Sequence, residues 1–342
     1  MKKIIVLAIF TFIIGLPTVG FSADEGEVYK LKIADPFPTN HPLNKIVHHF
    51  MELGQKYSNG RLEFTYYPAQ QLGKLKDLPK LCQQGMTDIA YIGLSFFPGQ
   101  FGLNLVVNLP YYTTAEEGSK IYMKLIKTSP ELQQEWSKNK VYPITLGVTN
   151  QYDVGSVKGP LNKPEDLKGL RCRVAGGLFE ATAKRYGIIP VTMSSNEVYE
   201  GLQRGIVDGT ILSLPSIKGY NLQELEKYHT LGMRMGGFCG VYAVNEKTLK
   251  KLPPDLQEAL KKAGAESTIY FAKVWDGMVK QLYQAFEKGG MTFTLITPEN
   301  RAVWDAPLKG IEEDWISKYE GMGLPARKVF EQFKTIALEI AK

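Results

Sequence analysis

Short apolar and β-branched runs alternate with longer amphipathic segments over the first 150 residues of the chain. A short apolar run favours a strand, whereas apolar side chains that recur every three or four residues favour a helix. The pattern predicts strands at residues 28–34, 61–66, 88–92 and 141–148, and helices at residues 42–57 and 76–84. Strands that alternate with helices are typical of an α/β protein.

A second α/β unit begins near residue 150, after a change of composition. Residues 150–170 are rich in glycine, proline and charge. The pattern then predicts strands at residues 171–174, 189–193 and 209–212, helices at 178–186 and 197–204, and returning strands at 230–235 and 240–244. Two α/β units crossed by returning strands predict two lobes with a cleft between them.

One predicted helix is too long for either lobe. Residues 254–288 keep a helical pattern, with Pro254 suited to the first turn and Gly289 to the end. At about 1.5 Å per residue, such a helix is roughly 50 Å long. We expect it to brace both lobes and to bend near Gly264. The predicted division is residues 24–149 plus 238–285 for the first lobe, and residues 150–237 plus 286–342 for the second.

The beginning of the chain has the pattern of a secretory signal peptide. Lys2 and Lys3 precede an apolar run over residues 4–16, and small residues follow up to Ser22 and Ala23. Residues 1–23 are therefore expected to be removed, with cleavage near Ser22 or Ala23. No cysteine lies near the cleavage point, so the mature chain is expected to be free in the periplasm and not lipid-anchored.

Charge and cysteine content narrow the class of protein further. The formal charge is +6 and falls to +4 without Lys2 and Lys3, which does not favour nucleic acid but is compatible with small anions. The three cysteines, Cys82, Cys172 and Cys239, allow at most one disulfide, and we expect buried structural thiols.

Catalytic and metal-binding patterns are weak. The adjacent His48 and His49 diverge by about 100° on a helix, so they cannot form the same-face pair of a zinc motif. His41 and His229 are likewise expected at the surface or partly packed. No nucleophile elbow, Walker loop or dinucleotide glycine motif occurs. The sequence therefore predicts no metal, no cofactor and no enzymatic activity.

Several motifs in fixed order carry a resemblance to a known family. They are Gln-Leu-Gly at residues 71–73 and the segments 85–90, 101–110, 164–174, 196–209 and 252–257. Along nearly the whole mature chain, this order resembles the solute-binding proteins of tripartite ATP-independent periplasmic (TRAP) transporters. The resemblance implies a two-lobed periplasmic-binding-protein fold and a monomeric receptor. Such a receptor would capture a small organic anion and deliver it to the small and large membrane subunits of an ion-gradient-driven permease.

The resemblance also implies a role for Arg173, which follows Asp166-Leu167-Lys168-Gly169. In the family this position pairs with the carboxylate of the ligand. A guanidinium suits that role, because its planar fork matches two carboxylate oxygens. Arg171 lies two residues earlier on the same strand face and ranks below Arg173, since Lys168 nearby suggests a solvated patch.

Departures from the family pattern bear on the kind of ligand. Many members carry a second arginine where this chain has Tyr152 and Asp153, and polar residues where this chain has Ile211 and Leu212. A less polar pocket favours a monoanion with an apolar or aromatic body over a dicarboxylate or a sugar acid. Arg234, between apolar neighbours on a predicted strand, could replace the missing arginine or form a structural ion pair.

Further ligand contacts are expected at strand ends that face the cleft. The candidates comprise aromatic side chains, hydrogen-bonding side chains and one apolar residue: Phe96, Phe97, Asn150, Gln151, Tyr152, Ser194, Ser195 and Leu212. Tyr91 and Phe238 are weaker candidates, because aromatic residues more often belong to a core. Two other classes of protein remain open: the binding protein of an ATP-driven transporter, and a periplasmic enzyme or sensory module on the same fold.

Overall fold

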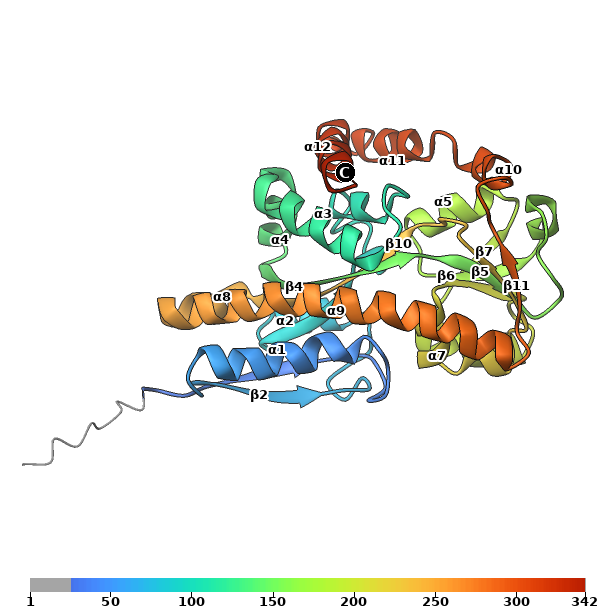
Figure 1. Cartoon of the computed structure of the whole chain (residues 1–342). Coiled ribbons are helices and arrows are strands. Elements are labelled where there is room, and N and C mark those ends of the chain that lie inside the picture. The colour runs from blue at the N-terminus through green and yellow to red at the C-terminus, as the bar shows by residue number, and fades with distance from the viewer. Residues whose placement is uncertain (1–25, 342) are drawn as a thin grey trace, which may run out of the picture.

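The computed structural model describes residues 26–341, so the signal peptide predicted at residues 1–23 lies outside the described part. Two sheets and the helices around them form two lobes (Figure 1). The strands are β1 (Tyr29–Ala34), β2 (Leu62–Tyr67), β3 (Ile89–Gly93), β4 (Val141–Gln151), β5 (Asp153–Ser156), β6 (Arg171–Val174), β7 (Ile189–Thr192), β8 (Gly209–Leu212), β9 (Tyr228–Leu231), β10 (Gly237–Asn245) and β11 (Thr292–Leu295).

The first lobe is built on a five-stranded sheet in the order β2-β1-β3-β10-β4. β1 runs parallel to β2 and β3, whereas β10 runs antiparallel to β3 and β4. Every residue of β10 is buried, as expected for a strand covered on both faces. The carboxyl ends of β1 and β3 therefore lie at the same edge of this sheet.

The second lobe is built on a six-stranded sheet in the order β11-β9-β5-β8-β6-β7. β6 lies parallel between β7 and β8, with Arg173 opposite Val191 and Thr210. β5 is antiparallel to both β8 and β9. The sheet contains both parallel and antiparallel pairs because β5 continues directly from β4 of the first lobe and runs against its neighbours.

Helices lie at all five predicted ranges, and seven further α-helices among the described residues were not predicted. The α-helices are α1 (Asn44–Tyr57), α2 (Leu78–Gln83), α3 (Ala115–Thr128), α4 (Pro130–Lys138), α5 (Leu178–Arg185), α6 (Val198–Gln203), α7 (Leu214–Gly219), α8 (Glu246–Lys251), α9 (Pro254–Lys288), α10 (Arg301–Asp305), α11 (Ile311–Glu320) and α12 (Ala326–Ile340). Short 3-10 turns connect them, including η1 (Leu94–Phe96) and η4 (Ser195–Glu197).

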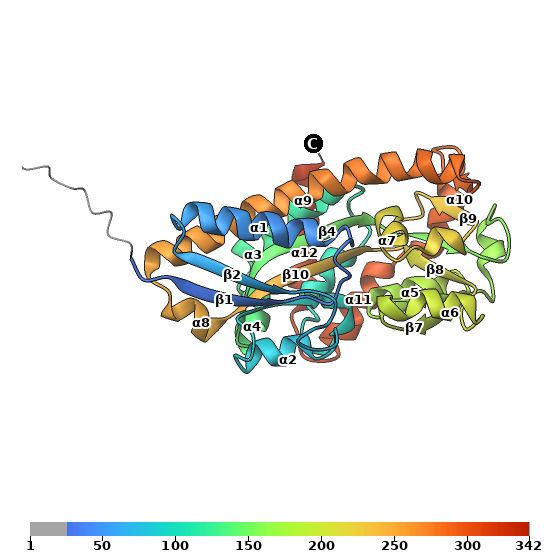
Figure 2. The same ribbon diagram turned by 90° about the horizontal axis from the view of Figure 1, so that it is seen from below.

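Helix α9 spans the molecule, as the sequence predicts. It packs against α1, α3 and β4 in the first lobe and against α7 in the second (Figures 1 and 2). The helix is continuous through Gly264, where a bend is expected. A Cβ at Gly264 would lie 2.2 Å from the carbonyl oxygen of Ile144, so the glycine instead allows α9 to approach β4 closely.

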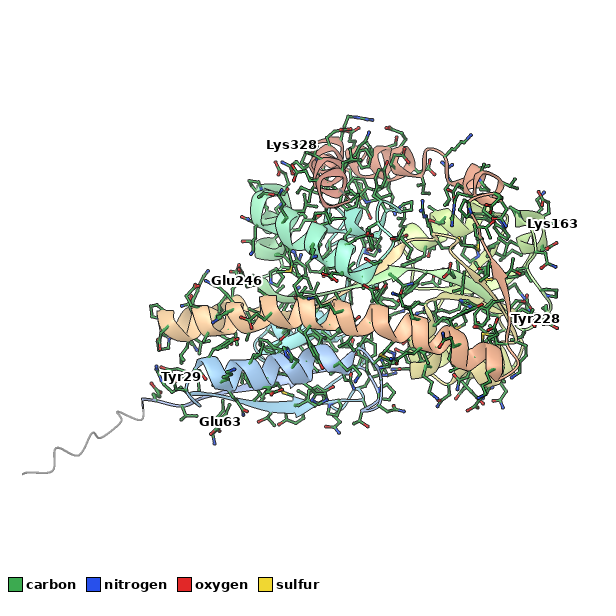
Figure 3. All side chains as sticks on the ribbon, in the orientation of Figure 1. Tyr29, Glu63, Lys163, Tyr228, Glu246 and Lys328 are labelled. Carbon is green, nitrogen blue, oxygen red and sulfur yellow. The ribbon has the colours of Figure 1, made fainter. Side chains whose placement is uncertain are left out.

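The ends of the two lobes lie far apart along α9. Tyr29 and Glu63 mark the β1–β2 edge, and Lys163 and Tyr228 mark the other end of the molecule (Figure 3). The C-terminal helix α12 returns to the first lobe, where Phe330 contacts Tyr111. The assignment of residues 286–342 to the second lobe is therefore wrong for α12, because its apolar face is buried against α3.

The chain crosses between the lobes at two adjacent segments in addition to α9. Tyr152, between β4 and β5, donates its N–H to the carbonyl of Gly236 (2.8 Å) and accepts from the N–H of Met235 (3.0 Å). Gly236 has a φ of 121°, which favours glycine. These two crossing segments form a narrow ribbon between the sheets.

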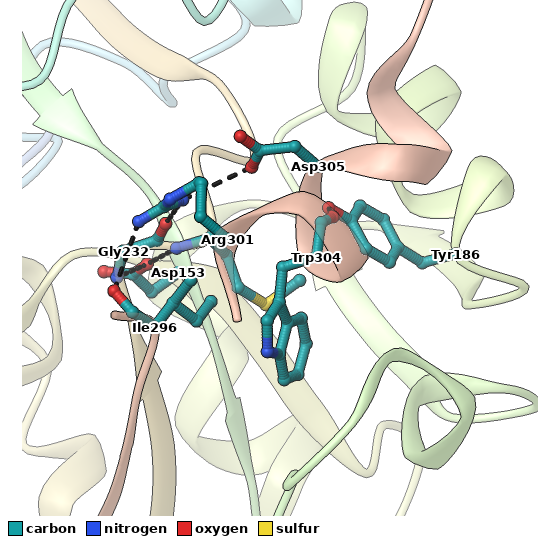
Figure 4. Close-up of polar contacts among 8 residues, drawn as sticks. Asp153, Tyr186, Gly232, Ile296, Arg301, Trp304 and Asp305 are labelled. Carbon is teal, nitrogen blue, oxygen red and sulfur yellow. Dashed lines mark hydrogen bonds and ion pairs between the residues drawn. The ribbon is translucent and has the colours of Figure 1, made fainter. Parts of the chain in front are cut away.

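A polar cluster anchors this ribbon on the second lobe (Figure 4). The Asp153 carboxylate accepts from the N–H groups of Gly232 (2.8 Å) and Met233 (2.7 Å). Arg301 of α10 donates to the carbonyls of Gly232 and Ile296 and pairs with Asp305 (3.3 Å). Burial raises the pKa of Asp153 to about 7.

The cysteine prediction is confirmed, since Cys82, Cys172 and Cys239 are buried and unpaired. Within residues 26–341 no helix is both long and apolar enough to span a bilayer. The same residues contain no group of three or more histidine, cysteine or acidic side chains arranged to hold a metal ion.

Candidate functional site

A narrow cavity lies between the two lobes. Its volume is about 20 Å³, counted as the room open to the centre of a water-sized sphere. Its walls come from both lobes and are mainly aromatic and apolar: Pro36, Phe37, His41, Leu43, Leu75, Tyr91, Phe96, Tyr152, Arg173, Ser194, Ser195, Asn196, Leu212, Ser216, Tyr220 and Phe238. Small-molecule sites typically combine such walls with a few polar groups.

A larger groove of about 660 Å³ lies on the first lobe, lined by residues of α3, α4, β4 and α9. All of its charged side chains, such as Lys127 and Glu258, are exposed or only partly buried. The interlobe cavity is the better candidate, because it contains a buried charge.

Arg173 is that buried charge. It lies on β6 and is 1% exposed. Its Nε donates to the carbonyl of Met193 (3.1 Å), and its Nη2 donates to the Oγ of Ser195 (2.8 Å). Among the described residues no acidic side chain forms an ion pair with it, and burial lowers its pKa. A buried guanidinium without a counter-ion is costly unless an anion binds it.

Arg171, on the same strand, has a different environment. Its guanidinium binds both carboxylate oxygens of Asp208, at 3.0 Å from Nε and 2.8 Å from Nη2. Hydrogen bonds from Arg171 lower the pKa of Asp208 to about 2, and Lys158 lies 3.5 Å from the same carboxylate. The donors of Arg171 are thus occupied by the protein, whereas donors of Arg173 remain available.

Aromatic rings form the wall beside Arg173. The ring of Tyr152 stacks with those of Phe179 (5.3 Å between centroids) and Phe238 (6.2 Å). Phe96 meets Phe238 edge-on at 6.1 Å. Rings fixed in this way present a flat, rigid surface to a ligand.

The structure brings together six of the predicted site residues and separates four. Phe96, Tyr152, Arg173, Ser194, Ser195 and Leu212 line the same cavity. Phe97, Asn150, Gln151 and Arg234 do not line it. Phe97 follows the 3-10 turn η1 and is only partly buried, packed against the core.

Asn150 and Gln151 lie at the end of β4, as expected, but they do not line the cavity. The Oδ1 of Asn150 accepts from the indole N–H of Trp275 (2.9 Å), and its Nδ2 donates to the carbonyl of Gln151 (2.8 Å). Gln151 donates to the carbonyl of Leu109 (3.5 Å). Both side chains therefore stabilise the crossing segment and do not reach the cavity.

Arg234 also lies outside the wall of the cavity. Strand β9 ends at Leu231, and Arg234 has a left-handed φ of 60° in the following segment. Its side chain lines a separate groove with Tyr111, Glu117 and Ala337. The cavity thus lacks a second arginine.

Sequence reasoning missed most of the wall from the first lobe. Phe37 and His41 follow β1, and this position at the carboxyl end of a strand was a usable signal.

On the second lobe, sequence reasoning also missed Ser216 and Tyr220, in and after α7. These two residues carried no such signal, because nothing in the sequence indicates that α7 faces the cavity.

The lobes contact each other across the cavity. Asn196 donates from Nδ2 to the carbonyl of Pro36 (3.3 Å), and the ring of His41 lies 4.6 Å from that of Tyr220. The structure is therefore a closed arrangement of the two lobes.

Comparison with known proteins agrees with this architecture. The family model described as "Bacterial extracellular solute-binding protein, family 7" (DctP) matches residues 33–318. The C4-dicarboxylate-binding periplasmic protein DctP of Rhodobacter capsulatus is 30% identical over 289 residues, which cover 80% of this chain and 82% of that protein.

Solved structures show the same fold. A TRAP solute-binding protein of Rhodoferax ferrireducens with copurified benzoate has a TM-score of 0.85 at 22% identity, covering 92% of this chain and 99% of that one. A marine metagenome TRAP protein with 3-hydroxybenzoate also has a TM-score of 0.85 at 22% identity, covering 92% and 100%. The chain therefore belongs to the DctP family, the solute-binding receptors of TRAP transporters.

Proposed function

We propose that this receptor binds a small carboxylate monoanion with an aromatic or apolar body in the cavity between its lobes. The observation that carries the proposal is the buried guanidinium of Arg173, which has no counter-ion among the described residues. A ligand carboxylate would supply that charge and accept from the unused guanidinium donors.

The charge of the cavity favours a monoanion. Arg173 is its only cationic side chain, because burial lowers the pKa of His41 to about 3 and keeps that ring neutral. A second ligand carboxylate would be buried without a charged partner, which is unfavourable. The relative from Rhodobacter capsulatus is named for C4-dicarboxylates, so the absence of a second cation argues for a different ligand here.

The lining of the cavity favours an aromatic or apolar body. The stacked rings of Tyr152 and Phe238 form part of its wall. An aromatic ring would pack against them, whereas the hydroxyls of a sugar ring need partners, each unpaired one costing about 1–3 kcal/mol. Benzoate and 3-hydroxybenzoate in structurally similar receptors support this choice.

The delivery step follows from the family. We infer that the mature protein, cleaved near Ser22 or Ala23, is a periplasmic monomer that hands its ligand to the small and large membrane subunits of a TRAP permease. It performs no chemistry on the ligand and needs no metal or cofactor.

Calorimetry on the mature chain tests the ligand class. After unfolding and refolding to remove retained ligand, the protein would be titrated with benzoate, 3-hydroxybenzoate, mandelate and phenylpyruvate. Succinate, malate, glucuronate and galacturonate would be titrated in parallel. We expect at least one aromatic monoanion to bind ten times more tightly than every dianion and uronate. A tenfold advantage for a dianion or a uronate would overturn the proposal.

A further inference from the structure

The first lobe contributes a polar side chain to the cavity that no protein group satisfies. His41 lies in the loop between β1 and α1 and is 2% exposed. Its ring stacks on Phe37 (4.6 Å) and lies against Tyr220 of the second lobe (4.6 Å). The sequence suggested a surface or partly packed histidine, but this ring is buried in the cavity wall.

The hydrogen bonds of His41 fix its tautomer. The N–H of Leu43 donates to Nδ1 (3.2 Å), so this nitrogen is an acceptor and the neutral ring carries its proton on Nε2. Burial lowers the pKa of the ring to about 3, so it stays neutral at ordinary pH. Nε2 is buried and has no hydrogen-bond partner among residues 26–341. The cavity wall therefore holds an unused donor.

Tyr91 supplies a second unused group on the same wall. It lies on β3, is 1% exposed, and its hydroxyl has no partner among the described residues. The ring of Phe37 contacts both side chains, at 4.6 Å from His41 and 4.7 Å from Tyr91. The two groups thus flank one aromatic ring of the first lobe, whereas Arg173 belongs to the second lobe.

We propose that His41 and Tyr91 form a subsite for a neutral oxygen of the ligand, a hydroxyl or a keto group distinct from its carboxylate. This inference rests on the proposed function, in which Arg173 holds the carboxylate. A neutral oxygen can accept from the Nε2–H of His41, and the hydroxyl of Tyr91 can donate to it or accept from it. A site built to bond an oxygen rejects analogues that lack it, because its buried polar groups then stay unpaired. The ligand class is thereby narrowed to hydroxy or oxo acids with an aromatic or apolar body.

Ligand pairs that differ by one oxygen test this subsite. The pairs are benzoate with 3-hydroxybenzoate, phenylacetate with mandelate, and 3-phenylpropanoate with phenylpyruvate, titrated into the mature wild type, His41→Phe and Tyr91→Phe. We expect wild type to favour the oxygenated member at least tenfold in one or more pairs. His41→Phe, which keeps a ring between Phe37 and Tyr220, should reduce that ratio below threefold, and Tyr91→Phe should also reduce it.

The ratio within a pair is the readout, so a general loss of affinity does not affect the test. His48→Phe is the matched control, because His48 is exposed and outside the cavity, and it should keep the wild-type ratio. If wild type shows no preference in any pair, or if both variants keep it, the subsite is wrong even though monoanions bind. If no monoanion binds to wild type, the proposed function itself fails.

Discussion

Two arginines on one short strand show how a residue's surroundings decide its role. Arg171 and Arg173 are two positions apart on β6, so alternation places them on the same face. Arg171, at the start of β6, forms an ion pair with Asp208. Arg173 faces the other lobe and donates to the hydroxyl of Ser195 and to the carbonyl of Met193. The sequence motif could rank the two residues, but only the fold shows that Arg171 is paired with a carboxylate and Arg173 is not.

Arg173→Ala should abolish tight binding while leaving the fold intact. Loss of one partner of a buried charge pair costs on the order of 2–5 kcal/mol, or roughly thirtyfold to several thousandfold in affinity. Calorimetry with the tightest aromatic monoanion measures the loss, and circular dichroism checks the fold. Arg171→Ala is the control and should bind within about threefold of wild type. Folded Arg173→Ala with nearly wild-type affinity would remove Arg173 from the site.

Glu226 gives a prediction about pH that does not involve the ligand. It is fully buried, and burial raises its pKa to about 8 despite the opposing effect of nearby Thr210. In the unfolded chain the pKa of a glutamate is about 4.3. Between these values the folded state keeps a proton that the unfolded state has lost, so stability falls as pH rises toward 8.

Glu226→Gln should remove that fall. From pH 6.5 to pH 8, wild type should lose roughly 1.4 kcal/mol per pH unit relative to the variant, as an upper estimate. His229, whose folded pKa is lowered to about 3, acts in the opposite direction below about pH 7, but its contribution is the same in wild type and variant and cancels in the comparison. Urea unfolding at both pH values measures the difference, with the exposed Glu200→Gln as control. Parallel curves for wild type and Glu226→Gln would contradict the raised pKa of Glu226.

At the scale of elements, hydrophobic periodicity predicted the helices and strands whose bounds depend on the local sequence. The helix at residues 254–288 and the strands at residues 171–174 and 209–212 have the predicted bounds. The strand expected at 230–235 ends at Leu231, because Gly232 and Arg234 adopt positive φ and the Asp153 carboxylate binds the local N–H groups. That bond joins residues 79 positions apart, so no local pattern could reveal it.

Helix α7 offers a substitution with opposite effects on stability and affinity. A Cβ at Gly219 would lie 2.4 Å from Cδ2 and 2.7 Å from Nε2 of His41, across the cavity. Gly219→Ala should therefore oppose closure of the lobes and weaken ligand binding about tenfold or more. In the open form the clash is absent, and alanine in a helix is favoured over glycine by up to about 1 kcal/mol.

Thermal unfolding without ligand and calorimetry with ligand measure the two effects separately. Gly277→Ala in α9 is the matched control, since a Cβ there meets no atom within 4 Å. It should keep wild-type affinity and gain stability of the same order. If Gly219→Ala binds as tightly as Gly277→Ala, contact between α7 and His41 does not limit closure.

At the scale of the whole molecule, the sequence predicted two lobes but not how their faces meet. The cavity combines loops after β1 and β3 with β6, η4 and α7, and the sheet order β2-β1-β3-β10-β4 sets which loops share an edge. That order depends on β10 inserting between β3 and β4 from more than 80 residues away. Long-range pairing of this kind is why the sequence could predict Arg173 but not which first-lobe loops lie opposite it.

The closed arrangement implies that the lobes move. A ligand enclosed between Arg173 and the rings of the first lobe cannot enter while Asn196 and Pro36 remain in contact. The connections that permit movement are the ribbon at Tyr152 and Gly236 and the long helix α9. Few polar contacts cross the cavity, so few hydrogen bonds are lost when the lobes open. A ligand that contacts both lobes binds the closed form more tightly than the open form, and it therefore shifts the equilibrium toward the closed form.

Small-angle scattering of the mature protein tests this movement. With a saturating aromatic monoanion, the radius of gyration of wild type should decrease, because the two lobes approach each other. Gly219→Ala should require more ligand for the same decrease, and Arg173→Ala should show no decrease at the concentration that saturates wild type. Identical wild-type profiles with and without ligand, at occupancy proven by calorimetry, would mean that the ligand enters without hinge closure. In that case the contacts between His41 and Tyr220 would be a permanent part of the fold.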